Sequence, residues 1–165
     1  MIRELANCFD RSVAFMRELV ADLSDEEMIL QPAGVPNHAA WTLGHVIHSC
    51  QAIAGELGVP PWLPDDWGSH FGYGSSPEKV SRSQRSCKPA LVAALTDASD
   101  RLQAALLAID ESRLADPLPD EKARGVLPTM GHALVQIVAA HTAYHAGQLA
   151  VWRRAIGRAP VGVFV

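Results

Sequence analysis

Apolar residues recur along this chain at steps of three and four, the spacing that places them on one face of an α-helix. Four stretches carry the pattern far enough to form long helices: residues 2–22, 37–57, 89–110 and 129–156. Asn37 and Thr129 are suited to cap the start of the second and fourth of these helices. Because no stretch alternates with the period of a β-strand, the pattern predicts an all-α protein, a four-helix bundle.

Two of the connections between these helices are long. The first, from Val59 to Lys88, has little periodicity and carries several aromatic residues, and the second covers residues 111–128. Loops of such length inside a domain are usually functional or disordered, and the first is too aromatic for disorder. We interpret it as an ordered flap over one end of the bundle. The alternative is a crossover connection without a functional part.

Composition narrows the class of protein. The length of 165 residues suits a single helical domain over residues 1–165. No apolar run reaches the roughly 18 residues that span a membrane, and a net charge of −4 disfavours a nucleic-acid partner. Three widely spaced cysteines indicate free thiols, and the first residues lack the order of a signal peptide. We therefore expect a cytoplasmic protein with neither a membrane nor a nucleic-acid partner.

Histidines interrupt the apolar stripes of two predicted helices. His141 and His145 lie one turn apart in the fourth, and His45 and His48 are three residues apart in the second. A buried imidazole costs free energy unless its nitrogens have partners, and a pair one turn apart can offer two nitrogens to one metal ion. The alternative is a set of unrelated core histidines with hydrogen-bond partners.

A third imidazole from the second helix would complete a metal site. Three imidazoles with one open position form the catalytic type of zinc site. Imidazole also suits nickel, copper and iron, so the ligands do not fix the metal. We expect one divalent ion per chain, with zinc as the first expectation and nickel or iron as alternatives. From the spacing, either His45 or His48 could be the third ligand.

Two motifs resemble those of a known family. Trp41-Thr42-Leu43-Gly44-His45 has the form W-x-L-G-H, and residues 141–148 have the form H-x-x-x-H-x-G-Q. Both are similar to motifs of the DinB/YfiT-like superfamily. The resemblance implies a four-helix bundle in up-down-down-up order with a long crossover loop. It also implies a divalent ion held by His45, His141 and His145.

The same resemblance bears on activity. Many members of the superfamily are viewed as metal-dependent enzymes, and some relatives transfer thiol cofactors such as bacillithiol, mycothiol or glutathione to electrophiles. The resemblance therefore implies a small-molecule substrate and a low-molecular-weight thiol as a second cofactor. It does not transfer a particular substrate. Bundles of this superfamily often pair, and the apolar tail from Val161 to Val165 adds to the expectation of a homodimer.

Mechanism is constrained by a missing carboxylate. Zinc hydrolases of the H-E-x-x-H type carry a glutamate beside their ligands, whereas only Thr142, Ala143 and Tyr144 separate the two histidines here. A metal-bound thiol needs no strong base, because coordination deprotonates it. We therefore favour a thiol S-transferase over a hydrolase. The alternative is a non-catalytic metal-binding or stress-related dimeric bundle.

The flap supplies further candidates. Asp65, Asp66 or His70 could accept a proton, and Tyr144 is a less favoured proton donor. Trp62 and Trp67 could wall an apolar pocket at the open coordination position. Gln148, one turn beyond His145, could hold a histidine or a metal-bound water. His38 lies near a helix start and is expected in solvent.

Overall fold

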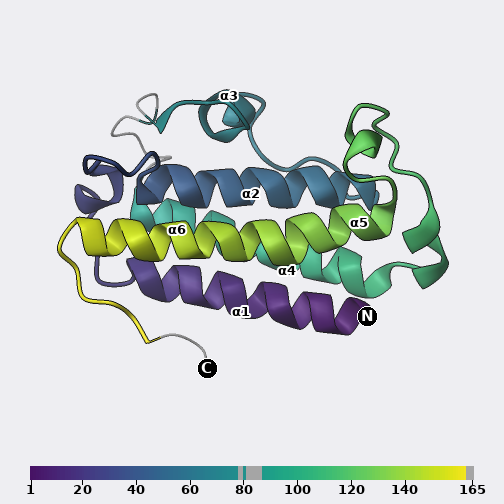
Figure 1. Cartoon of the computed structure of the whole chain (residues 1–165), viewed down its shortest axis with the longest axis horizontal. Helices are drawn as coiled ribbons and strands as arrows, with labels where there is room; N and C mark the ends of the chain where they lie inside the picture. Colours follow the sequence, from purple (N-terminus) through teal and green to yellow (C-terminus); the bar gives the residue numbers. More distant parts are fainter. Residues whose placement is uncertain (78–79, 81–86, 163–165) are drawn as a thin grey trace.

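The computed structural model describes residues 1–77, 80 and 87–162. Four long helical segments lie side by side along the long axis of the molecule (Figure 1). They are α1 (Ile2–Val20), α2 (Ala39–Glu56), α4 (Lys88–Ala108) and a fourth segment composed of α5 (Met130–Leu134), η5 (Val135–His141) and α6 (Thr142–Ala155). No β-strand occurs in the described ranges. The prediction of an all-α four-helix bundle is confirmed.

The helices form a closed ring in which α1 and α2 each pack against both α4 and the fourth segment. Figure 1 shows that α1 and the fourth segment run one way along the molecule, and that α2 and α4 run the other way. Because α2 and α4 are parallel, the chain must return along the bundle between them. The returning segment contains the short helix α3 (Trp67–Phe71), which packs on α2.

The core is formed by the apolar stripes of all four segments. On α1 the buried positions include Phe9, Val13 and Met16, and α4 contributes Leu95 and Leu102. Each fully buried side chain of this size contributes about 1.5–3 kcal/mol relative to an exposed one. Hydrophobic burial along the whole length of the bundle therefore fixes the two helices that carry the histidines.

The start of α2 differs from the prediction. His38, not Asn37, caps the helix, and its Nδ1 accepts a hydrogen bond of 3.1 Å from the Trp41 backbone N–H. His38 is buried rather than solvated, because its Nε2 also donates to the Pro77 carbonyl at 3.1 Å. Burial lowers the pKa of His38, which keeps the ring neutral and able to accept. The predicted cap at Thr129 is confirmed.

The sequence predicts a regular α-helix for the fourth segment. The structure instead contains the π-helix η5 within it. Its buried positions recur at steps of four: Met130, Leu134, Val138, Thr142 and Ala146. In a regular α-helix four such steps would rotate the stripe by about 160°. The wider π turn removes most of this drift. The Thr142 hydroxyl supports the turn by donating to the carbonyl of Ile137 at 3.0 Å.

A buried ion pair ties the end of the fourth segment to α1. Arg153 is 4% exposed, and its Nη2 lies 2.8 Å from Oδ2 of Asp22. Arg153 Nη1 also donates to the Leu19 carbonyl at 2.9 Å. This guanidinium is thus desolvated and depends on Asp22 for compensation of its charge.

Asp22→Asn is expected to lower the free energy of unfolding by about 2 kcal/mol at neutral pH. This is less than the cost of breaking a fully buried pair, because the Asp22 side chain is half exposed and solvent screens part of the interaction. Hydrogen bonds from Arg153 hold the folded-state pKa of Asp22 at about 2, against 3.8 without them. The contribution should therefore be present above pH 4 and disappear as the pH falls towards 2.

Chemical denaturation over this pH range measures the effect. The matched control is Asp97→Asn, which removes an exposed pair with Arg101 on one helix face and should change stability by less than about 0.5 kcal/mol. Equal effects of the two substitutions at neutral pH would show that the Asp22 pair contributes no more than a surface pair.

No helix in the described part of the chain is both long enough and apolar enough to cross a membrane. The last three residues of the apolar tail, Val163 to Val165, lie outside the described residues. The homodimer that the tail suggested stays a prediction.

Candidate metal centre

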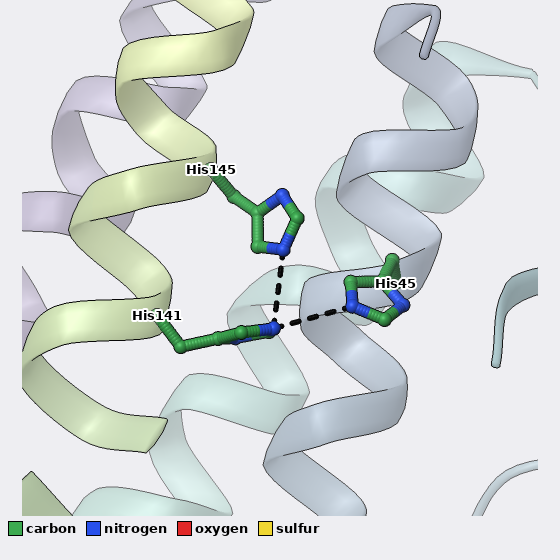
Figure 2. A group of neighbouring side chains, drawn as sticks. All are labelled: His45, His141 and His145. Carbon is green, nitrogen blue, oxygen red and sulfur yellow. Dashed lines mark hydrogen bonds between the residues drawn. The ribbon is translucent and has the colours of Figure 1, made fainter. Parts of the chain in front are cut away.

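Three imidazoles from two helices meet beside α2. Figure 2 shows His45 on α2 facing His141 and His145 on the fourth segment. Nε2 of His141 lies 3.2 Å from Nε2 of His45 and 3.1 Å from Nε2 of His145. His45 and His145 are buried and His141 is half-buried. The three residues that the resemblance implied as ligands are therefore gathered at one point.

The outer nitrogens of two rings determine where the lone pairs point. His45 Nδ1 lies 2.7 Å from the Phe71 carbonyl, which can only accept, so His45 donates through Nδ1 and carries a lone pair on Nε2. His145 Nδ1 donates in the same way to Oε1 of Gln148 at 2.8 Å. His141 Nε2 faces both lone pairs and has at most one proton to offer. At most one of these two contacts can therefore have a proton between its nitrogens, and the other brings two nitrogens together without one, an arrangement that a cation would satisfy.

The spacing also fits a metal ion. Two zinc–nitrogen bonds of about 2.0–2.1 Å at a tetrahedral angle separate the nitrogens by about 3.3 Å, close to the two distances here. Burial lowers the pKa of both His141 and His145 to about 4, and neighbouring histidines add to the shift. Burial also lowers the pKa of His45. All three rings are therefore neutral near pH 7, as metal ligands must be.

The structure gathers His45, and not His48, with the pair on the fourth segment. His48 lies on the neighbouring part of α2 and faces Gly68 of α3. A Cβ added at Gly68 would lie 3.3 Å from Cε1 of His48. The atom Nδ1 of His48 is buried and has no hydrogen-bond partner among the described residues. Helical spacing alone could not separate the two histidines, because both lie near the same face of α2.

The motif around His45 has a structural explanation. The ring of Trp41 stacks on His45 with centroids 4.7 Å apart. Gly44 admits the ring of Phe71, since a Cβ at Gly44 would lie 2.2 Å from Phe71 Cδ1. The indole Nε1 of Trp67 donates to the Gly44 carbonyl at 3.1 Å. α3 thus packs on α2 at Gly44, and this contact places the Phe71 carbonyl against His45.

The motif on the fourth segment holds His145 in a similar way. Gln148 accepts from His145 and donates through Nε2 to the Tyr144 hydroxyl at 2.9 Å. The Tyr144 side chain is 62% exposed, so it supports Gln148 from the surface. The expectation that Gln148 holds a histidine agrees with this geometry.

Gln148→Leu is expected to weaken binding of a divalent ion by about 10- to 100-fold, the usual effect of removing a hydrogen bond behind a metal-bound histidine. Competition with a chromophoric chelator measures the affinity. Gln136→Leu on the exposed side of η5 is the matched control and should leave it unchanged. An unchanged affinity in Gln148→Leu would show that His145 is oriented by packing alone.

A cleft of about 400 Å³ opens at the histidines. Its walls come from α2, from the fourth segment, from Tyr73 and from the connection between α4 and α5. The lining residues are His45, His48, Ser49, Ala52, Ile53, Glu56, Tyr73, Leu118, Asp120, Ala123, Leu127, Ala133, Ile137 and His141. The connection after α4 was not expected to take part in the site. Apolar residues within this mainly polar connection, Leu114, Leu118, Val126 and Leu127, were the available signal, and Leu118 among them is buried.

The flap contributes to the centre differently from the prediction. The guanidinium of Arg101 lies over Trp62, with its Cζ atom 5.3 Å from the centroid of the tryptophan ring. Trp67 is buried against α2. Neither tryptophan is among the described residues that line the cleft. The flap instead supplies Tyr73 to the wall and the Phe71 carbonyl to His45.

The candidate proton acceptors of the flap also lie elsewhere. Asp65 and Asp66 are exposed, and His70 Nε2 lies 3.8 Å from Oδ2 of Asp66. None of the three lines the described cleft. α3 turns this part of the flap towards solvent, because its apolar face is committed to α2 through Trp67 and Phe71.

Comparison with known proteins agrees with this architecture. The family model described as the DinB superfamily matches residues 9–149. A crystal structure of the conserved protein of locus from Enterococcus faecalis is similar, with a TM-score of 0.79 and 21% sequence identity over 96% of this chain and 98% of that chain. At this identity the likeness shows the fold alone. The comparison with curated proteins gave no match.

Proposed function

The chain belongs to the DinB superfamily, and on that premise we propose that it is a metal-dependent enzyme of the thiol S-transferase type. One observation carries the proposal: three imidazole nitrogens converge, without enough protons to satisfy them, at the end of a cleft. His45, His141 and His145 would hold the ion. A divalent ion at this point deprotonates a coordinating thiol.

The charged groups around the cleft favour a thiol over water as the activated group. The carboxylates that line it are Glu56 and Asp120, and Glu56 stands 11 residues along α2 from His45, roughly 16 Å away. Asp120 lies two residues after Leu118, whose backbone N–H binds the Pro128 carbonyl, so it lies near the start of α5 and not at the histidines. A hydrolase needs a base close to its metal-bound water, and neither of these lining carboxylates is placed there. His48 is the titratable side chain next along α2 from His45, so it is placed to exchange a proton with a bound electrophile.

The remaining walls suit a small substrate. Ile53, Leu118, Leu127 and Ile137 present aliphatic side chains to the cleft. A cavity of about 400 Å³ with mainly apolar walls and a few polar groups at one end is typical of sites for small molecules. The walls would hold the apolar body of the electrophile and reduce the access of water to the histidines.

The test begins with elemental analysis of the purified protein, which should give about one divalent ion per chain. Replacement of that ion by cobalt(II) then provides a visible spectrum, and a thiol that binds to the ion should add a sulfur-to-cobalt charge-transfer band. Transfer of the same thiol to a small electrophile is followed by mass spectrometry. One ion per chain with neither thiol binding nor transfer would indicate a non-catalytic metal-binding bundle. Absence of the ion after reconstitution would refute the metal centre itself.

A further inference from the structure

The cleft is elongated and its two ends differ in chemistry. Along α2 its lining residues His45, Ser49, Ile53 and Glu56 follow one another at steps of three and four, so they form a line along one helix face. At 1.5 Å per residue this line is roughly 16 Å long. The facing wall repeats the arrangement, with His141 at one end and Ala133 at the other.

The middle of the cleft is covered by the connection between α4 and α5. Leu118 and Leu127 from this connection line the cleft together with Ile53 of α2 and Ile137 of η5. Leu118 N donates to the Pro128 carbonyl at 3.3 Å, which fixes the two ends of the covering segment to each other. A ligand that starts at the histidines must therefore pass an apolar stretch before it reaches the far end.

The far end carries negative charge. Glu56 ends the line on α2, and Asp120 lies two residues after Leu118, whose bond to the Pro128 carbonyl places it at the start of α5 and away from the histidines. The described lining residues include no lysine or arginine. Asp120 is held in place because its Oδ1 accepts from the backbone N–H of Lys122 at 2.9 Å. Arg124, a cation of the same connection, is engaged by Glu121 at 3.5 Å and by the Pro119 carbonyl at 3.3 Å.

Resting on the proposed function, we propose that the cleft selects thiols that carry an amine at the end remote from sulfur, separated from it by an apolar chain. The sulfur would lie at the three histidines, the chain against Leu118 and Ile137, and the ammonium group near Glu56 and Asp120. A carboxylate in the ammonium position would meet two charges of its own sign in a largely apolar cleft. Thiols rich in carboxylates, such as glutathione, are on this basis poor ligands.

Three thiols of equal chain length test the selection: a long-chain ω-aminoalkanethiol, the corresponding ω-mercaptoalkanol and the corresponding ω-mercaptoalkanoate. Binding is measured with cobalt-substituted protein through the charge-transfer band. We expect the amine to bind about tenfold more tightly than the carboxylate, with the alcohol between them. The short pair cysteamine and mercaptoacetate should show little difference, because neither reaches the far end.

The double variant Glu56→Gln, Asp120→Asn identifies the residues responsible. Both changes are nearly isosteric, and the asparagine oxygen can still accept from Lys122 N–H. We expect the preference between amine and carboxylate to disappear and binding of the alcohol to stay as in the parent. A preference that survives in the double variant would overturn the assignment, and so would equal binding of the three long thiols to the parent protein.

A second measurement separates this inference from the proposed function. A long-chain alkylamine and the alkanoate of equal length, both without sulfur, are titrated into metal-free protein by calorimetry. If thiols fail to bind but the amine is still preferred, only the thiol function is refuted. If thiols bind without regard to charge, only the selection is refuted. Failure of every ligand would overturn both.

Discussion

Replacing His141 by alanine is expected to abolish stoichiometric binding of a divalent ion. His141 Nε2 stands between the other two Nε2 atoms, so its loss leaves two ligands without the central one. The affinity should fall by more than the 10- to 100-fold that follows from changes behind a ligand. Elemental analysis after dialysis, followed by chelator competition, measures the loss.

Stability provides a second readout, which is measured with and without metal. Bound ion stabilises the parent by about 4 kcal/mol at 1,000 times its dissociation constant, and His141→Ala should lack this gain. Without metal, the variant should lose no more stability than truncation of a half-buried side chain normally costs. The reason is that it also removes a close approach of two unprotonated nitrogens. The controls are His48→Ala and His132→Ala, the second at an exposed histidine of α5, and both should keep the ion. Loss of metal from His48→Ala with retention in His45→Ala would show that the third ligand is His48.

Gly44→Ala is expected to damage both the fold and the metal centre. The added methyl would lie 2.2 Å from the Phe71 ring, so the ring must move and carry α3 with it. Overpacking of this kind costs about 2–3 kcal/mol of stability. Movement of α3 also withdraws the Phe71 carbonyl from His45. The affinity for a divalent ion should therefore fall by about 10- to 100-fold. Chemical denaturation of metal-free protein and chelator competition measure the two effects separately.

The same helix offers a matched control for Gly44→Ala. Gly55 also lies on α2, but an added Cβ there meets no atom within 4 Å. Gly55→Ala should therefore leave metal affinity unchanged and raise stability by roughly 0.5–1 kcal/mol, because alanine is the better helix former. If both variants kept the parent's affinity, the contact of α3 with α2 would have no part in positioning His45.

The long helices could be predicted because each buries one apolar stripe. The predicted range 2–22 compares with Ile2–Val20, and 89–110 compares with Lys88–Ala108. The same periodicity placed the histidines on buried faces, and two short motifs implied the trio. The periodicity identifies the side of each helix that faces inward. That information is sufficient to predict the bundle and the segments that carry the ligands.

The features without a signal in the sequence depend on contacts between distant segments. α3 has only five residues, too few to be stable alone, and it forms where Phe71 meets Gly44. His38 caps α2 because Pro77 provides a partner for its second nitrogen. The covering role of Leu118 and Leu127 follows from the path of their connection over the cleft. None of these has a periodic signature in the sequence.

The π turn of the fourth segment has a consequence for how this protein can change in evolution. A π turn holds about one residue more than an α turn, so removing one residue from η5 would restore a regular α-helix with little rotation of α5 relative to α6. Met130 and Leu134 would stay in the core, and His141 and His145 would stay opposite His45. A deletion of one codon at Ala140, whose side chain faces solvent, should therefore be tolerated. The same deletion in the middle of α2, a regular helix, would turn its two halves by about 100° relative to each other.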